Sequence, residues 1–380
     1  MEDAPLNIVH CLRAPVGGLF RHVCDLATEQ AARGHRVGVI ADAGSGGQAA
    51  RERLTELARH CRLGVERLSM GRLPGPADAL TAWRVARFAR DWRADILHGH
   101  GAKGGAYARI AGSRLGGAER PLRVYTPHGG SLHYGRRSPD GLLYLGLERA
   151  LLRSTDLIIF ESDYGRRQFE AKVGGPGNLA RVIHNGLRPE EFTPISPEAD
   201  AADFVFLGEL RWLKGVDVLL HALARLSGEP DLVIAGEGAD RTRLEKLASG
   251  LGLDARVHFA GRQPTRPALA RGRCLVVPSR AESLPYIVLE GIAAELPVVA
   301  TNAGGIAEIF ADRSTRLVPP DDAEALADAM AAIRARPEDS RREAAELAGS
   351  VAARFSVGNM ADKTLAAYRE TLNGGQLKAS

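Results

Sequence analysis

Two glutamates, Glu282 and Glu290, have the types and spacing most suggestive of chemistry in the 380-residue chain. Residues 274–277 before them are predicted to form a short buried strand, and Pro285 suits the first turn of a helix, where its missing N–H costs nothing. Glu290 would then lie roughly 12 Å from Glu282, at about 1.5 Å per helical residue. A helix N-terminus between them attracts phosphate, so the pair could bind the two ends of a nucleotide-diphosphate sugar. Two solvated surface glutamates are the plainer interpretation of a bare pair.

Basic side chains follow another predicted strand, residues 204–207. The segment 208–215 carries Arg211 and Lys214, and cations three positions apart beyond a strand can hold the two phosphates of a diphosphate. A solvated basic loop is the alternative. Gly236 provides a tight exit from the next strand of this half, 232–235.

Histidines end two strands of the first half. His98 closes strand 96–98 ahead of a glycine-rich helix that carries Lys103, and His128 follows strand 123–126. We expect such histidines to face a ligand, where they can donate to a sugar hydroxyl or act as acid or base. A histidine that merely caps a strand is the alternative. The spacing of His98, His100 and His128 matches no zinc pattern, so no metal site is predicted.

A glycine pair, Gly17-Gly18, stands between the first strand and the first helix. Paired glycines let the backbone approach a ligand closely with its amides turned toward it. A plain tight turn explains the pair about as well.

Short apolar runs alternate with helical patterns, which predicts α/β architecture with parallel sheets and crossover helices. The series occurs twice, so we expect two doubly wound, Rossmann-like domains, residues 1–190 and 191–356, then a C-terminal helix and polar tail over 357–380. That helix is a candidate for packing back on the first domain. Ligands of such sheets bind beyond the carboxyl ends of the strands, so a cleft between two facing domains is predicted. The expected strands are 6–12, 36–41, 96–98, 123–126, 157–161, 181–184, 204–207, 232–235, 257–259, 274–277, 298–300 and 316–318, and the clearest helices are 18–33, 81–92, 216–226 and 285–295.

The composition is that of a globular protein, with 45% hydrophobic and 25% charged residues and no apolar run long enough for a membrane span. The acidic start and four scattered cysteines predict a cytoplasmic location. Residues 1–190 hold 28 Lys/Arg against 19 Asp/Glu, a net charge of +9, and the remainder has −5. The basic half favours an anionic partner, and residues 83–93, with Trp at both ends of a basic helix, could touch the inner face of the plasma membrane. Packing of Val85, Phe88 and Trp92 in the core is the preferred alternative.

Taken in order, the glycine pairs, the basic residues and the two glutamates resemble the retaining glycosyltransferases of family 4, which have the GT-B fold. The resemblance covers nearly the whole chain and rests on Gly17-Gly18, Lys214-Gly215, Gly236-Glu237-Gly238, the Glu282/Glu290 pair and Gly304-Gly305.

The resemblance implies a role for each matching residue. Glu282 matches the glutamate that faces the donor sugar, and Glu290 the one that holds the ribose. Lys214 matches the lysine on the diphosphate, and His128 a histidine near the transferred sugar. Many members carry arginine where Glu209 stands here, so Arg211 is the candidate substitute. The implied catalytic residues are Glu282, His128, Lys214 and Arg211; the donor-binding residues are Gly18, Lys214, Arg211, Gly236, Glu282, Ser283, Leu284 and Glu290; the acceptor-binding residues are Gly17, His98 and Lys103.

The implied activity is transfer of a sugar from a UDP- or GDP-sugar to an acceptor hydroxyl with retention of configuration and without cofactor or metal. By resemblance, the acceptor is a saccharide or a lipid-linked molecule in bacterial cell-envelope polysaccharide, lipopolysaccharide or glycolipid synthesis. A nucleotide-sugar epimerase of the same fold and a non-catalytic sugar-binding protein remain alternatives. No recognition motif supports nucleic-acid binding.

Overall fold

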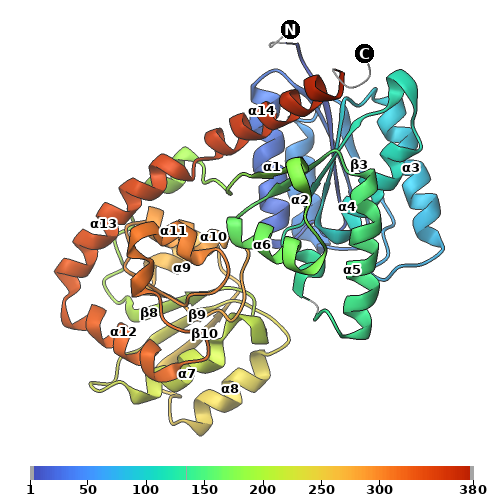
Figure 1. Ribbon diagram of the computed structural model, residues 1–380. Helices are drawn as coiled ribbons and strands as arrows, with labels where there is room; N and C mark the ends of the chain where they lie inside the picture. Colours follow the sequence, from blue (N-terminus) through green and yellow to red (C-terminus); the bar gives the residue numbers. More distant parts are fainter. Residues whose placement is uncertain (1–3, 134, 377–380) are drawn as a thin grey trace. The chain divides into compact units, whose positions relative to one another are not determined.

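A computed structural model of the protein describes residues 4–133 and 135–376. It divides into two compact units, Met1–Gly186 with Val357–Ser380, and Leu187–Ser356. The first break falls just before the predicted boundary at 190/191. The last helix, α14 (Val357–Gln376), belongs to the first unit, where it packs beside α1 (Gly17–Ala32), as Figure 1 shows.

The first unit is built on a seven-stranded, wholly parallel sheet in the order β3-β2-β1-β4-β5-β6-β7. The order reverses between β1 and β4, which is where ligands of doubly wound sheets bind. The strands are β1 (Asn7–Leu12), β2 (Arg36–Asp42), β3 (Gly64–Leu68), β4 (Ile96–His100), β5 (Leu122–Thr126), β6 (Leu157–Phe160) and β7 (Ala180–Val182). Besides α1 and α14, the helices are α2 (Gly47–Ala58), α3 (Ala77–Asp91), α4 (Gly101–Ser113), α5 (Pro139–Leu151) and α6 (Asp163–Lys172).

Alternation along β4 decides what each face of this sheet carries. Leu97 packs with α3 and α4, whereas Ile96 packs in the cluster that includes α14. Because successive side chains point to opposite faces, His98 and His100 share the face of Ile96. Gly99 faces α4 so closely that a Cβ there would meet the carbonyl oxygen of Gly104 at 2.5 Å.

The second unit has a five-stranded parallel sheet in the order β10-β9-β8-β11-β12, which reverses between β8 and β11. The strands are β8 (Ala202–Leu207), β9 (Leu232–Ala235), β10 (Val257–Gly261), β11 (Gly272–Val277) and β12 (Val298–Ala300). The helices are α7 (Val216–Arg225), α8 (Arg241–Gly250), α9 (Thr265–Ala270), α10 (Tyr286–Ala293), α11 (Ile306–Phe310), α12 (Ala323–Ala335) and α13 (Pro337–Arg354).

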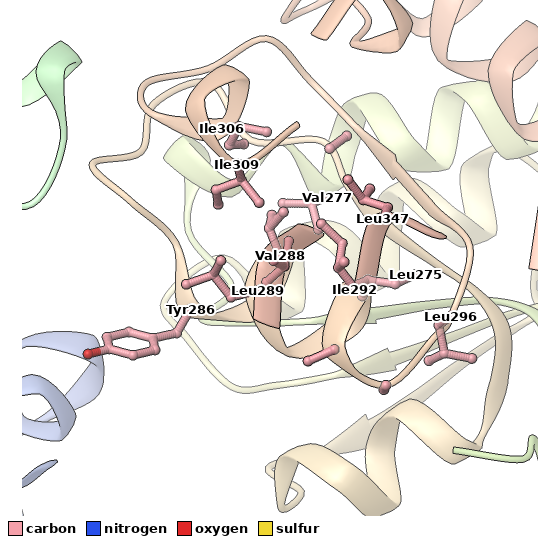
Figure 2. Close-up of a cluster of buried hydrophobic side chains, with 14 of the residues drawn as sticks. Leu275, Val277, Tyr286, Val288, Leu289, Ile292, Leu296, Ile306, Ile309 and Leu347 are labelled. Carbon is pink, nitrogen blue, oxygen red and sulfur yellow. The ribbon is translucent and has the colours of Figure 1, made fainter. Parts of the chain in front are cut away.

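Helix α10 is held against β11 by one apolar side. Figure 2 shows Val288, Leu289 and Ile292 of α10 clustered with Leu275 and Val277 of β11, all of them buried. The contact is close because α10 has a glycine on this side: a Cβ on residue 291 would lie 2.3 Å from the Leu275 side chain. The helix thus fixes the loop that precedes it, which carries Glu282.

Two elements differ from the sequence predictions. Strand β3 was not predicted, because only Leu68 among its five residues is buried and it lies at the edge of the sheet. The predicted strand 316–318 is absent as a strand; Val318 makes a single parallel bridge to Thr301. Within the described ranges, no helix is both long and apolar enough to cross a membrane.

Candidate functional site

In the second unit, the reversal of strand order brings together two loops that lie far apart in the sequence. The loop after β8 carries Lys214 and the loop after β11 carries Glu282, and the two strands are neighbours. Lys214 Nζ lies 2.6 Å from Glu282 Oε1. The side chains are 18% and 9% exposed, so the ion pair is close to the surface but largely shielded. A cation and a carboxylate at a strand-order reversal suit a ligand that carries both phosphate and hydroxyl groups.

Ser279, which the sequence reading missed, completes this pair. Its hydroxyl donates to Glu282 Oε1 at 2.6 Å and is buried. Thr301, at the end of β12, in turn donates to the Ser279 carbonyl oxygen at 2.6 Å. A serine two residues after a buried strand and three residues before the glutamate was the available signal.

Close backbone contacts require the glycines at the strand exits of this unit. A Cβ on Gly215 would lie 2.0 Å from the Pro278 carbonyl oxygen, and one on Gly236 would lie 1.9 Å from that of Gly208. At Gly304, which has φ +65°, a Cβ would lie 2.0 Å from the Glu282 carbonyl oxygen. These glycines therefore permit the loops to pack together, whether or not a ligand also approaches them.

Arg211 and Glu209 interact with each other. Arg211 Nε lies 3.4 Å from Glu209 Oε2, and both side chains are about half exposed. The glutamate that stands where the family arginine was expected is therefore the present partner of the candidate substitute. An arginine in an exposed pair of this kind is weakly held and can turn toward a stronger anion.

Three further predicted donor residues lie on or just before α10, whereas Gly18 is an exposed residue of α1 in the first unit. Ser283 and Leu284 follow Glu282 in the loop, and the Ser283 carbonyl accepts from the Gly305 amide at 2.8 Å. Glu290 is the fifth residue of α10 and is half-buried, with the helix beginning just after Pro285. The loop and the first turn of α10 thus present these residues in one continuous segment.

The first unit has a separate pocket of about 520 Å³ at the carboxyl ends of β1, β4 and β5. This is again the place where the strand order reverses. Its basic lining residues come from three segments: Arg13 follows β1, Lys103 is in α4, and Arg72 follows β3. The complete lining is Arg13, Ala14, Leu19, Arg72, Leu73, His100, Gly101, Ala102, Lys103, Pro127, His128, Gly130, Asp140 and Tyr144.

The ammonium group of Lys103 is already paired with a carboxylate of the first unit. Its Nζ lies 2.6 Å from both carboxylate oxygens of Asp78 and 3.0 Å from the Leu73 carbonyl oxygen. Burial would raise the pKa of Asp78, but the hydrogen bonds from Lys103 and Tyr107 outweigh it and lower that pKa. The described contacts of Lys103 therefore stabilise the wall of the pocket. Its contact with an acceptor remains a prediction.

His98 does not reach the pocket, contrary to the prediction that it contacts an acceptor. Its ring is fully buried, with Nδ1 2.6 Å from the Tyr368 hydroxyl of α14 and Nε2 2.8 Å from Thr126 Oγ1. The prediction was wrong because it placed the histidine by its position at a strand end and ignored which face of the strand it occupies. Gly17, the glycine predicted to bind the acceptor, is the exposed first residue of α1, with φ +63°.

His128 lines the pocket, but its ring is turned inward. Nδ1 lies 2.8 Å from Glu161 Oε1, and Nε2 lies 3.1 Å from Nδ1 of His100. The backbone of His128 has φ +51°, a left-handed conformation that costs about 1–2 kcal/mol for a residue with a Cβ. The two ring contacts hold the side chain of this strained residue, so the pocket-facing loop is fixed from beneath.

Glu161 was missed as a site residue, although the sequence reading placed it at the end of a strand. Burial alone would raise the pKa of Glu161, but the adjacent rings of His128 and His22 help to lower it to about 2. His22 is itself buried, and its Nδ1 lies 2.9 Å from Asn185 Oδ1. A polar residue at the carboxyl end of an otherwise apolar strand was the signal, because buried carboxylates are rarely left without partners.

Five histidines gather beneath the pocket, and two sets of three have ligand atoms within 4.8 Å of one another. The sets are His10, His98 and His100, and His22, His100 and His128. Burial lowers the pKa of His10 to about 4 and holds that of His100 well below its usual range. Neutral imidazoles in such numbers can either hydrogen-bond one another or hold a metal ion.

The basic helix of the first unit is mainly a core element. Val85 of α3 is fully buried, and Phe88 and Trp92 pack against the same cluster. Trp92 lies where a Cβ on Gly38 would meet its ring at 2.7 Å. Trp83, by contrast, is 49% exposed. The alternative of core packing therefore holds for three of the apolar residues, and Trp83 stays available at the surface.

Comparison with known proteins identifies the family of the chain. A family model described as Glycosyltransferase Family 4 matches residues 16–191, and one described as Glycosyl transferases group 1 matches residues 201–335. A D-inositol 3-phosphate glycosyltransferase of Saccharomonospora viridis is 30% identical over 94% of this chain and 90% of its own. The EpsD protein of Bacillus subtilis, named a putative glycosyltransferase, is 32% identical over 65% of this chain and 69% of its own.

Solved structures match over almost the entire length. Sucrose-phosphate synthase from Thermosynechococcus elongatus has a TM-score of 0.82 at 21% identity, with 98% of this chain and 100% of that chain covered. Anabaena HepE in complex with UDP and glucose has a TM-score of 0.79 at 21% identity, with 97% and 100% covered. At these identities the likeness establishes the fold, two parallel α/β domains of the GT-B type.

Proposed function

Because the chain belongs to the group 1 glycosyltransferases of family 4, we propose that it transfers a sugar from a nucleotide-diphosphate sugar to an acceptor hydroxyl with retention of configuration. The observation that carries this proposal is the Lys214–Glu282 pair at the strand-order reversal of the second unit. The Lys214 ammonium group suits the diphosphate, and the Glu282 carboxylate suits the sugar hydroxyls. UDP, present in the HepE complexes, and GDP are the nucleotides we propose for the donor.

The proposed reaction breaks the bond between the anomeric carbon and the diphosphate oxygen, and the electron pair leaves with the diphosphate. Lys214 and Arg211 would stabilise that negative charge as it develops. Glu282, fixed by Ser279, would orient the sugar through its hydroxyls. The acceptor oxygen would bond on the face from which the diphosphate departs, and its proton would pass to the leaving group. We propose no metal or cofactor, since the basic side chains take the role of a metal.

The acceptor would bind the pocket of the first unit. Arg13 and Arg72 line it, and the charge of Arg13 is one of the groups that lower the pKa of Asp42. Two such guanidinium groups favour an acceptor that bears an anionic group, since arginine recognises phosphate well. D-inositol 3-phosphate is the first acceptor to test, because relatives carry its name. Lipid-linked saccharides of the bacterial cell envelope are the second class.

The proposed function is tested by release of nucleoside diphosphate. The chain is screened for thermal stabilisation by UDP, GDP and ADP, and the sugars of the best nucleotide are then assayed with each acceptor. A ligand at 100 times its Kd stabilises by about 2.7 kcal/mol, so binding should visibly raise the Tm. We expect release of nucleoside diphosphate that depends on the acceptor and persists in EDTA. The product should have the same anomeric configuration as the donor sugar. Stabilisation by none of the nucleotides would contradict the proposal. Interconversion of the nucleotide sugar without release of diphosphate would favour the epimerase alternative.

Replacement of Arg211 by alanine should weaken nucleoside diphosphate binding by at least about tenfold, because a hydrogen bond to a charged group contributes about 1.5–3 kcal/mol and about 1.4 kcal/mol is a factor of ten. Isothermal titration with the diphosphate measures the change. Arg243→Ala, on exposed α8 of the same unit, is the matched control and should bind normally. If Arg211→Ala binds as tightly as the unaltered chain, Arg211 is not the second phosphate ligand.

We also propose peripheral contact of the first unit with an anionic membrane at the cytoplasmic face. Trp83, Leu80 and Leu73 are exposed apolar residues near the exposed Arg84 and Arg87. Co-sedimentation with vesicles should rise when phosphatidylglycerol is added to phosphatidylcholine, and should fall in Trp83→Ala. Equal sedimentation with both vesicle types would refute membrane contact.

A further inference from the structure

We propose that three buried side chains, Gln30, His10 and His100, are positioning residues. They form a hydrogen-bond chain of fixed direction that holds the pocket residue His128 in a single tautomer. Only the kinetic part of the test below rests on the proposed function.

The chain crosses the first unit through four hydrogen bonds. Gln30 Oε1 lies 2.8 Å from His10 Nε2, and His10 Nδ1 lies 3.0 Å from His100 Nε2. His100 Nδ1 lies 3.1 Å from His128 Nε2, and His128 Nδ1 lies 2.8 Å from Glu161 Oε1. The residues come from α1, β1, β4 and the segments that follow β5 and β6. Each ring thus uses both of its nitrogens within the chain.

The carboxylate end sets the direction. Glu161 faces His128 Nδ1 with a carboxylate oxygen, and a carboxylate in its ordinary ionised form only accepts. His128 Nδ1 must therefore donate. A neutral imidazole has one donor and one acceptor, so His128 Nε2 then accepts from His100. The same rule makes His100 Nε2 accept from His10, and all three rings carry their proton on Nδ1.

An independent observation at the other end agrees with this direction. His10 Nε2 must accept, so the amide nitrogen of Gln30, and not its oxygen, should face it. With the oxygen there, the buried Gln30 nitrogen makes no hydrogen bond. A half-turn of the amide gives the nitrogen a partner, His10 Nε2. An unsatisfied buried donor costs about 1–3 kcal/mol, so the half-turn is favoured.

The opposite direction requires a second proton on His128. Its Nε2 would then donate to His100, His10 Nε2 would donate to Gln30, and the Gln30 nitrogen would stay without a partner. A metal ion bound by three of the rings would abolish the chain altogether. Both are outcomes of the test, and the unsatisfied amide argues against the first.

The consequence lies in the pocket. His128 has a left-handed backbone, and its ring is clamped at both nitrogens, so the loop Pro127–Gly130 is preorganised. Loosening one clamp would let the loop relax. A displacement of about 1 Å at a reacting centre lowers turnover by about 100-fold.

The decisive experiment is nitrogen-15 NMR of histidine-labelled full-length protein at neutral pH, in which long-range couplings distinguish Nδ1–H from Nε2–H. Signals are assigned from single His→Gln variants, and metal content is measured on the same sample. We expect Nδ1–H for His10, His100 and His128. Nε2–H at His10 or His100, a doubly protonated His128, or one equivalent of metal would each overturn the proposal.

A variant at the far end separates this mechanism from simple packing. Glu161→Leu removes the acceptor that sets the direction, so the proton of His10, three hydrogen bonds away, should move to Nε2. Glu161→Gln keeps an acceptor oxygen and should leave His10 unchanged. Exposed His60 is the internal reference and should not respond in either variant. A folded Glu161→Leu protein with unchanged His10 would refute the fixed direction.

The kinetic part uses His100→Leu. We expect kcat for sugar transfer to fall about 10- to 100-fold, with KM for the nucleotide sugar unchanged, because Lys214 and Glu282, the proposed contacts of the diphosphate and the sugar, are in the other unit. His100→Asn restores a donor near the position of Nδ1 and should recover part of kcat, while His60→Leu should have no effect. A rise in KM alone, or no rescue by asparagine, would contradict a positioning role. If no donor and acceptor pair reacts at all, the proposed function fails while the tautomer result stands.

Discussion

Replacement of Lys214 by methionine is expected to lower kcat for sugar transfer by about 100- to 1000-fold, the usual effect of removing one group that stabilises transition-state charge. Methionine keeps the unbranched apolar stem and removes only the ammonium group. The charge on the diphosphate oxygen grows as the glycosidic bond breaks, and Lys214, held 2.6 Å from Glu282, is the cation placed for it. Release of nucleoside diphosphate at saturating donor and acceptor measures the change.

Loss of the partner of Glu282 complicates the interpretation, because a largely buried carboxylate would be left without its cation. Thermal unfolding of Lys214→Met, alone and with Glu282→Gln, separates lost stability from lost chemistry. Lys246→Met, at an exposed position of α8, is the matched control and should turn over normally. Turnover of Lys214→Met within threefold of the unaltered chain would remove Lys214 from the mechanism.

The strand exits of the second unit could be predicted because each signal is local. An apolar run that ends in glycine and a charged residue specifies both the strand and the side chain after it, and parallel strands place such exits at one edge. Residue 214 and residue 282 could not be paired from sequence by that argument alone. Their contact depends on β8 and β11 being neighbours, which is a property of the strand order.

The first unit was harder to predict because its polar residues lie inside the strands. His98 and His100 differ by two positions and so share one face, buried under helices that are distant in sequence, α1 and α14. The sequence prediction used only the position of His98 at the end of a strand, and it therefore placed the His98 side chain toward a ligand. His10 lies in the middle of a buried strand and was passed over, although a polar residue in an apolar run is itself evidence of a buried partner.

A buried ion pair of the first unit gives the second large expected effect, a loss of stability when one partner is replaced. Arg109 of α4 and Glu148 of α5 form an ion pair at 2.8 Å with side chains 0% and 4% exposed. The carboxylate also accepts from the Tyr125 hydroxyl at 2.7 Å, and the guanidinium lies 3.9 Å from the centre of the Tyr125 ring. Removing one partner of a buried pair costs about 3–5 kcal/mol, because the other charge is left uncompensated.

Glu148→Leu should therefore lower the free energy of unfolding of the first unit by about 3–5 kcal/mol. The double variant Arg109→Met/Glu148→Leu should recover most of it, because two apolar side chains leave no buried charge. Urea unfolding in a Trp212→Phe background measures this, since the remaining tryptophans, Trp83 and Trp92, both report on the first unit.

An ion pair at the surface is the control that tests whether burial of the charge causes the loss of stability. Arg53 and Glu56 lie 2.8 Å apart, as close as the buried pair, but both side chains are well exposed. Glu56→Ala should cost less than about 1 kcal/mol, because solvent compensates the remaining charge. Equal losses for Glu148→Leu and Glu56→Ala, or a double variant no more stable than Glu148→Leu, would show that uncompensated charge is not the cause. The expected ranking follows from desolvation, since the two ion pairs have the same separation and the Arg109–Glu148 pair is buried whereas the Arg53–Glu56 pair is exposed.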